Sequence, residues 1–153
     1  MIEYKTDFSR ICNNIPIWEW YELSVGIEKS LISLEDVILY ATLILSEDLA
    51  QFDLVLELSI ATEEEAREIL HELIEVIGKN DIQQAYNKWI FAIIYDAILN
   101  SKDNIYDIIE DIYVEFDYPE IISNLIRYMP CDDNRSLEEK LTEYVSANKE
   151  IWC

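Results

Sequence analysis

The chain has 153 residues, of which 32 are Asp or Glu and 11 are Lys or Arg, so its net charge is −21. Nucleic-acid binding draws most of its free energy from Lys and Arg that displace condensed counterions, so this charge argues against direct contact with DNA, RNA or an anionic membrane. Apolar residues make up 51% of the chain, which is enough for a folded core and argues against an acidic disordered tail.

Turn-forming residues are scarce, with two glycines and three prolines, and this favours helices over a β-sandwich or barrel. Apolar residues at spacings of three and four, together with capping signals, predict where the helices lie. The first is expected at 16–29, with Pro16 at its first position. Ser33 is expected to cap the second helix, and Ser46 to open the third.

The fourth predicted helix has clear signals at both ends. Thr62 and Glu65 form a Thr-x-x-Glu capping box at its start, and Gly78 stands where a left-handed C-cap belongs. Apolar and glutamate side chains between them fall on opposite faces, as in an amphipathic helix. Later helices are expected at 102–115, at 119–128 and from Ser136 onward.

The helix expected at about 81–99 differs from the others, because Asp96 is the only charge between Trp89 and Leu99. A helix that is apolar nearly all round belongs in the middle of a bundle, yet this stretch is well short of the roughly 18 residues that a membrane span needs. The sequence therefore predicts an all-α fold: a single helical domain over 1–153, built as a bundle of seven or eight helices around a central apolar helix. Because the first ten residues are charged and lack an apolar run, we expect a cytoplasmic protein.

Patterns that suggest catalysis are weak. Glu68 and His71 have the Glu-x-x-His spacing of carboxylate-bridged di-iron bundles, but such a site needs two pairs and His71 is the only histidine. We expect His71 to lie on a solvated helix face. The cysteines, Cys12, Cys131 and Cys153, lack paired spacing and are expected to be free thiols. The sequence predicts no catalytic residue, no metal and no cofactor.

One enzymatic alternative stays open, that of a magnesium-dependent all-α nucleotide hydrolase. Such enzymes hold magnesium with Glu-x-x-Glu on one helix and Glu-x-x-Asp on a later one. Glu72 and Glu75, or Glu65 and Glu68, supply the first motif, but no partner follows at matching spacing. Asp96 is a candidate buried base, although the favoured interpretation is structural: it forms a hydrogen bond to a nearby Tyr or Trp, or it reaches the edge of the core.

The acidity is concentrated in stretches that contain no Lys or Arg. Residues 30–66 include nine acids, and residues 103–126 include seven acids and four aromatics. Within the second stretch, acids at every fourth position place four carboxylates along one line of a helix. Carboxylates steer a basic protein and aromatic side chains anchor it, so we expect a partner-binding surface here. Its predicted residues are Asp103, Tyr106, Asp107, Glu110, Asp111, Tyr113, Glu115, Asp117, Tyr118 and Glu120.

Short strings along the chain resemble a family of small bacterial proteins of unknown function. They are Phe116-Asp117-Tyr118-Pro119-Glu120, Arg127-Tyr128-Met129-Pro130, Val25-Gly26-Ile27 and Leu31-Ile32-Ser33-Leu34-Glu35-Asp36-Val37. Members of that family are similar to immunity proteins, or antitoxins, that are encoded beside secreted polymorphic or contact-dependent toxins, whose C-terminal domains are often nucleases. The resemblance implies an immunity protein that occludes a basic nuclease domain of a cognate toxin. A non-catalytic helical adaptor is a further alternative.

Overall fold

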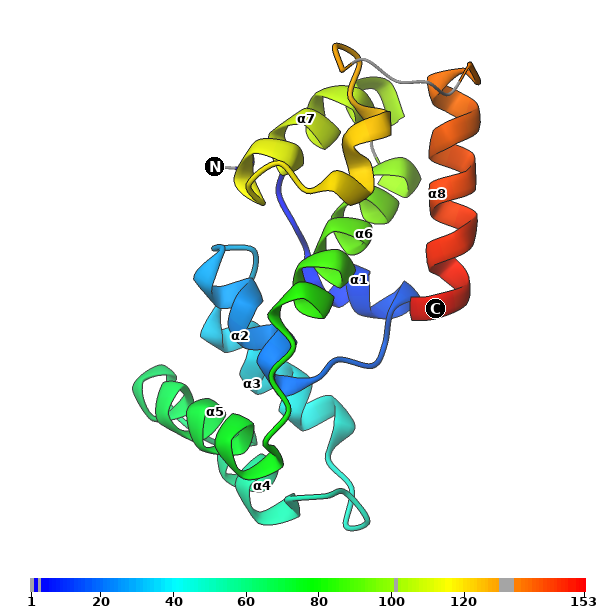
Figure 1. The fold of residues 1–153 in the computed structure, drawn as a ribbon. Helices are drawn as coiled ribbons and strands as arrows, with labels where there is room; N and C mark the ends of the chain where they lie inside the picture. The colour runs from blue at the N-terminus through cyan, green and yellow to red at the C-terminus, as the bar shows by residue number, and fades with distance from the viewer. Residues whose placement is uncertain (1, 3, 101, 130–133) are drawn as a thin grey trace. The chain divides into compact units, whose positions relative to one another are not determined.

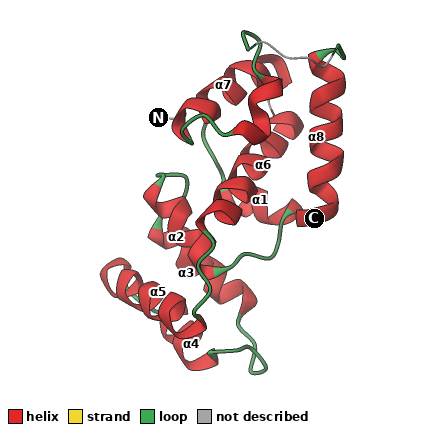
Figure 2. Ribbon diagram, viewed as in Figure 1, coloured by secondary structure: helices red, strands yellow, loops and turns green. Residues whose placement is uncertain are grey.

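The computed structural model describes residues 2, 4–100, 102–129 and 134–153, and within these ranges the chain is helical with no strand (Figures 1 and 2). The all-α prediction is confirmed, with eight α-helices and two 3₁₀ helices in the described ranges. The helices are α1 (Phe8–Asn14), α2 (Trp20–Glu28), α3 (Leu34–Ile44), α4 (Phe52–Ser59), α5 (Glu63–Ile77), α6 (Ile82–Asn100), η1 (Lys102–Asn104), α7 (Ile105–Glu115), η2 (Glu120–Leu125) and α8 (Leu137–Trp152). In this part of the chain no helix is both long and apolar enough to cross a membrane.

The chain divides into two compact units. The continuous unit, residues 17–85, holds α2 to α5 and the first turn of α6. The discontinuous unit joins residues up to Pro16 with 86–153, and holds α1, most of α6, α7, α8 and both 3₁₀ helices. The prediction of one domain over 1–153 stays a prediction.

Local capping signals place several helix ends correctly. The Ser33 hydroxyl accepts a hydrogen bond from the Asp36 amide at 3.2 Å, and α3 begins at the next residue. The Thr62 hydroxyl likewise accepts from the Glu65 amide, and Gly78 ends α5 in the left-handed region at φ +74°. Ser136 caps α8 in the same way, as its sequence predicts.

Two predicted helix starts are wrong, and each has a local cause. Helix α2 begins at Trp20 rather than Pro16, because the Tyr40 hydroxyl accepts from the Trp18 amide at 2.9 Å and donates to the Trp18 carbonyl at 3.2 Å. Those bonds hold Trp18 outside the helix. Helix α4 begins at Phe52 rather than after Ser46, because Gln51 has φ +59°, a left-handed conformation that interrupts a right-handed helix.

Three other segments also differ from the predictions. Helix α1 had no clear sequence signal, and Asp7 caps it by accepting from the Arg10 amide at 3.3 Å. The helix expected at 102–115 starts as the 3₁₀ turn η1 and becomes α-helical at Ile105. The segment expected at 119–128 is the 3₁₀ helix η2, and Pro130, its expected end, lies outside the described residues.

Helix α6 forms the core of the discontinuous unit, as predicted for 81–99. From Trp89 to Ile94 every side chain is at most 1% exposed. Aromatic contacts join α6 to its neighbours: Phe8 of α1 lies 6.1 Å from Trp89, and Tyr144 of α8 lies 6.2 Å from Phe91, between ring centroids. Within this unit Figure 1 shows α1, α7 and α8 around α6.

Candidate partner-binding face

Helix α7 carries the acidic stretch on a regular amphipathic helix. Its isoleucines at 105, 108, 109 and 112 are buried against the rest of the unit. Asp107, Asp111 and Glu115 follow one another at every fourth position, so their carboxylates share one line of the helix. Asp107 is exposed, and Asp111 and Glu115 are partly exposed. Asp103 lies in η1, whose tighter turn shifts it from the α-helical register. The predicted line of four is therefore three carboxylates on α7 with Asp103 just before it.

Arg127 folds back onto this face and pairs with two of its acids. Its guanidinium donates from Nε to Glu110 Oε2 and from Nη2 to Asp107 Oδ1, both at 2.6 Å. The two carboxylates raise the pKa of Arg127 above its ordinary value, mainly through these hydrogen bonds. Asp107 is 67% exposed and Glu110 is 25% exposed, so the pair lies at the surface.

Sequence reasoning missed this pairing. Arg127 is the first base after the stretch without any, and it lies 17 and 20 residues from its partners. The connection is made by η2, which packs against both α7 and α8. Like-charge repulsion along α7 is consequently relieved by a residue that no helical spacing identifies.

A tight turn after α7 fixes the aromatic margin of the face. Asp117 and Tyr118 both have left-handed backbone, at φ +59° and +58°, and the Tyr118 amide donates to the Tyr113 carbonyl at 2.7 Å. The Tyr113 and Tyr118 rings meet edge to face with centroids 5.3 Å apart. Phe116 is buried beneath the turn, while Val114 and Tyr118 are each 60% exposed. The face therefore presents a fixed aromatic and apolar edge beside its acids.

Other predicted residues lie away from that turn. Asp103 and Tyr106 line a cavity that helix α8 closes on its other side. Burial raises the pKa of Tyr106, and the negative charge of Glu138 on α8 adds to the effect. Glu120 is exposed at the start of η2. The structure thus brings together Asp107 with Glu110 and Tyr113 with Tyr118, and places Asp103 and Tyr106 in the cavity.

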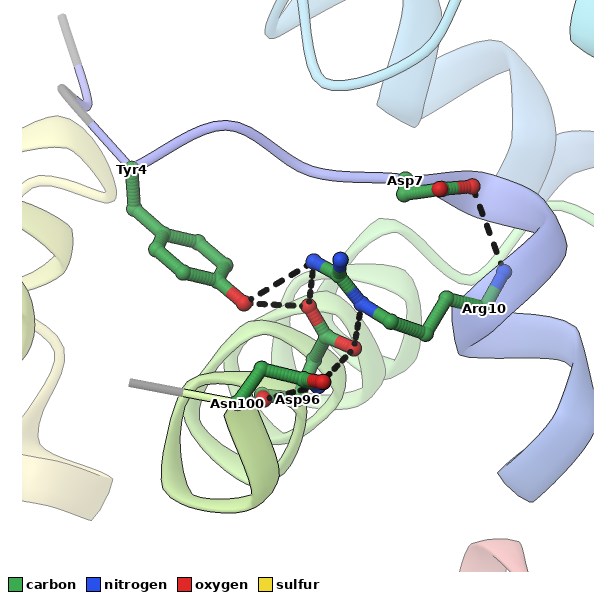
Figure 3. A network of polar contacts seen from close by, with 5 residues as sticks. All are labelled: Tyr4, Asp7, Arg10, Asp96 and Asn100. Carbon is green, nitrogen blue, oxygen red and sulfur yellow. Dashed lines mark hydrogen bonds and ion pairs between the residues drawn. The ribbon is translucent and has the colours of Figure 1, made fainter. Parts of the chain in front are cut away.

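Asp96, the candidate buried base, is held in a closed network (Figure 3). Its side chain is 2% exposed. Arg10 donates to both carboxylate oxygens, from Nε at 2.8 Å and from Nη2 at 2.7 Å. Tyr4 donates its hydroxyl to Oδ2, and Asn100 donates to Oδ1 at 3.2 Å.

The network supports a structural role for Asp96. A carboxylate has about four acceptor positions, and four hydrogen bonds reach this one. Burial raises the pKa of Tyr4 to about 12, with Asp96 adding to the rise, so Tyr4 keeps its donated proton at neutral pH. The predicted hydrogen bond to a tyrosine is confirmed, and Arg10 and Asn100 are additional partners.

The weaker catalytic candidates lie on open surface. His71 is 74% exposed, with Nε2 3.1 Å from a Glu75 carboxylate oxygen. Within the described ranges no three Asp, Glu, His or Cys side chains converge as metal ligands would. Cys12 is partly exposed, Cys153 is exposed, and Cys131 lies outside the described residues.

Comparison with known proteins places the chain in a bacterial context. Residues 8–152 match the family described as "Uncharacterized protein conserved in bacteria (DUF2247)". No curated protein and no solved structure matches the chain.

Proposed function

Because the chain belongs to this bacterial family, whose description names no activity, we propose a function from the geometry of the α7 face. The protein is an immunity protein that binds a basic nuclease domain of a secreted toxin and blocks its substrate surface. The observation that carries this proposal is the Arg127 contact, in which two carboxylates of the face hold one guanidinium at 2.6 Å.

The contact supports the proposal because it has the geometry that a partner's arginine needs. Asp107 and Glu110, three residues apart on α7, receive two different nitrogens of the same guanidinium. A guanidinium binds phosphate oxygens in the same forked manner. An acidic helix face can therefore take the place of the nucleic-acid backbone in a basic cleft.

Charge also acts before contact is made. The net charge of −21 gives the chain a strong negative field, and the second base-free stretch places seven acids on or beside α7. Opposite charges on two proteins accelerate their association, and the effect weakens as salt screens the field. Binding through this face is therefore expected to be fast and salt-sensitive.

The aromatic edge supplies the contact that charge alone does not. Tyr118 and Val114 are each 60% exposed, and Tyr118 is supported by the ring of Tyr113. Tyrosine is enriched at the energetic centres of protein interfaces, where its burial slows dissociation. A supported, exposed tyrosine beside a line of acids suits a protein partner better than a small substrate.

The proposal is tested by co-expressing the protein with the C-terminal nuclease domains of secreted toxins, beginning with any that is encoded immediately upstream. Growth rescue and a stoichiometric complex that survives purification are expected. Absence of both rescue and complex would overturn the immunity proposal. Magnesium-dependent nucleotide hydrolysis by the purified protein would instead favour the enzymatic alternative, with Glu72 and Glu75 as its first candidates.

A further inference from the structure

A cavity opens in the discontinuous unit where the end of α6, the start of α7 and the length of α8 meet. Its volume is about 560 Å³. Sites for small organic ligands and short peptide segments fall within roughly 300 to 1,000 Å³. The cavity is therefore large enough for one long side chain together with part of its neighbour.

The cavity is lined by apolar and polar side chains together, and the polar ones include the hydroxyl groups of Thr142 and Ser146. Ile98, Ile105, Leu141 and Val145 form apolar wall. Asp103, Tyr106 and Glu138 add two carboxylates and a hydroxyl, and the negative charge of Glu138 adds to the rise of the Tyr106 pKa that burial causes.

The one cation in the lining, Lys149, lies far from the Glu138 end. The two residues are 11 positions apart on α8, which corresponds to about 16 Å along the helix. Lys149 also lies over the Tyr95 ring, with its Nζ 5.5 Å from the ring centroid. The positive charge of Lys149 therefore lies away from the carboxylate of Glu138.

We propose that this cavity binds a basic side chain, arginine or lysine, of the partner protein, with the adjacent apolar residue packed against Leu141 and Val145. The inference rests on the proposed function, because the side chain that enters the cavity is part of the toxin domain proposed as the partner. Charge complementarity selects the occupant: two carboxylates line the same cavity as four apolar side chains, which suits a cationic head on an aliphatic stem.

The cavity also differs from the α7 face, because the one cation of its lining, Lys149, lies away from Glu138. Asp107 and Glu110 already hold Arg127, so a partner's arginine has to displace it there. Asp103 and Glu138 take part in none of the ion pairs within the described ranges. An incoming cation is therefore expected to enter the cavity without displacing a basic side chain of this chain.

The test uses two short peptides and needs no toxin. N-acetyl-leucyl-arginine amide is titrated into the protein while amide and methyl NMR signals are followed, and N-acetyl-leucyl-citrulline amide serves as its uncharged isostere. Shifts centred on Tyr106, Leu141 and Val145 are expected with the arginine peptide. Binding of the citrulline peptide is expected to be about tenfold weaker, since charge-assisted hydrogen bonds are lost.

Variants tie the binding to the cavity. The double variant Asp103→Asn with Glu138→Gln is expected to bind the arginine peptide only as tightly as the wild type binds the citrulline peptide. Glu150→Gln, which neutralises an exposed acid of the same helix outside this cavity, is a single-charge control and is expected to bind like the wild type. Circular dichroism shows whether each variant keeps its helices.

Equal affinity for the two peptides, unchanged binding by the double variant, or shifts elsewhere on the surface would each overturn the cavity assignment. The growth assay judges the proposed function separately. Rescue of growth without peptide binding overturns the cavity assignment alone. Peptide binding without rescue overturns the immunity function, and with it the source of the side chain.

Discussion

Two arginine–carboxylate contacts in the discontinuous unit share their chemistry and differ in their surroundings. Arg10 donates twice to Asp96, which is 2% exposed on the central helix. Arg127 donates to Asp107 and Glu110 at the surface of α7, where Asp107 is 67% exposed. A buried carboxylate cannot exchange its partner for water, whereas an exposed one can. The Arg10–Asp96 contact therefore stabilises the fold, whereas the acids that hold Arg127 can exchange it for water or for another charged group.

The largest expected effect breaks the buried contact. Arg10→Ala leaves Asp96 charged and buried, and loss of one partner of a buried pair costs about 3 kcal/mol of the free energy of unfolding, near the lower end of the usual range because Arg10 is partly exposed. Urea unfolding at neutral pH measures this. If the variant kept the urea midpoint of the wild type, the remaining hydrogen-bond partners of the Asp96 carboxylate would be sufficient without Arg10, which would contradict this account.

A smaller effect is expected from the tyrosine of the same network. Tyr4→Phe removes a hydrogen bond to a charged acceptor and is expected to cost about 1.5 kcal/mol at pH 7. The pKa of Tyr4 is raised from its ordinary 10.0 to about 12, so the folded state holds this proton more tightly than the unfolded state. The contribution of the Tyr4 hydroxyl to the free energy of unfolding is complete below pH 10 and is lost as pH rises through about 12.

Alkaline unfolding checks the sign of that linkage. The difference in stability between wild type and Tyr4→Phe is expected to shrink from pH 10 to 12, because the wild type loses the contribution that the variant lacks. Tyr21 of the continuous unit also has a pKa raised to about 12, chiefly by burial, so some alkaline destabilisation is expected to persist in Tyr4→Phe. A difference that stays constant over this range would contradict the linkage.

The smallest effect on stability is expected at the surface contact. Arg127→Ala is the same substitution as Arg10→Ala, but water can replace the guanidinium at Asp107 and Glu110. Its urea midpoint is expected to stay close to that of the wild type. A loss as large as that of Arg10→Ala would erase the distinction between the two contacts and give α7 a structural role instead.

Local sequence signals predicted much of this architecture. The capping residues Ser33, Thr62 and Ser136 act on the amide three residues later, so their effect is visible within one turn of sequence. The central helix was also predictable. Its apolar stretch carries a single charge, at Asp96, and a helix that is apolar on nearly all sides is stable in a buried core.

Contacts between distant parts of the chain were not predictable in the same way. Tyr40 prevents the helix expected from Pro16 through bonds to Trp18, which is 22 residues away. Arg10 reaches Asp96 across 86 residues, and Arg127 reaches Asp107 across 20. Side-chain spacing identifies the acids of α7, but it does not show which base folds onto them or which acids line a cavity.

The central claim, that the α7 face binds a basic partner, is tested most directly by charge reversal. Asp107→Lys with Asp111→Lys is compared with Glu64→Lys and Glu68→Lys on α5, which has the same four-residue spacing and the same change in net charge. Affinity for the toxin domain that the co-expression test identifies as the partner is measured by calorimetry at low and high salt. We expect the α7 variant to bind at least about tenfold more weakly at low salt, and the α5 variant to bind nearly as the wild type does. Equal losses for the two variants, or no loss for the α7 variant, would contradict the claim.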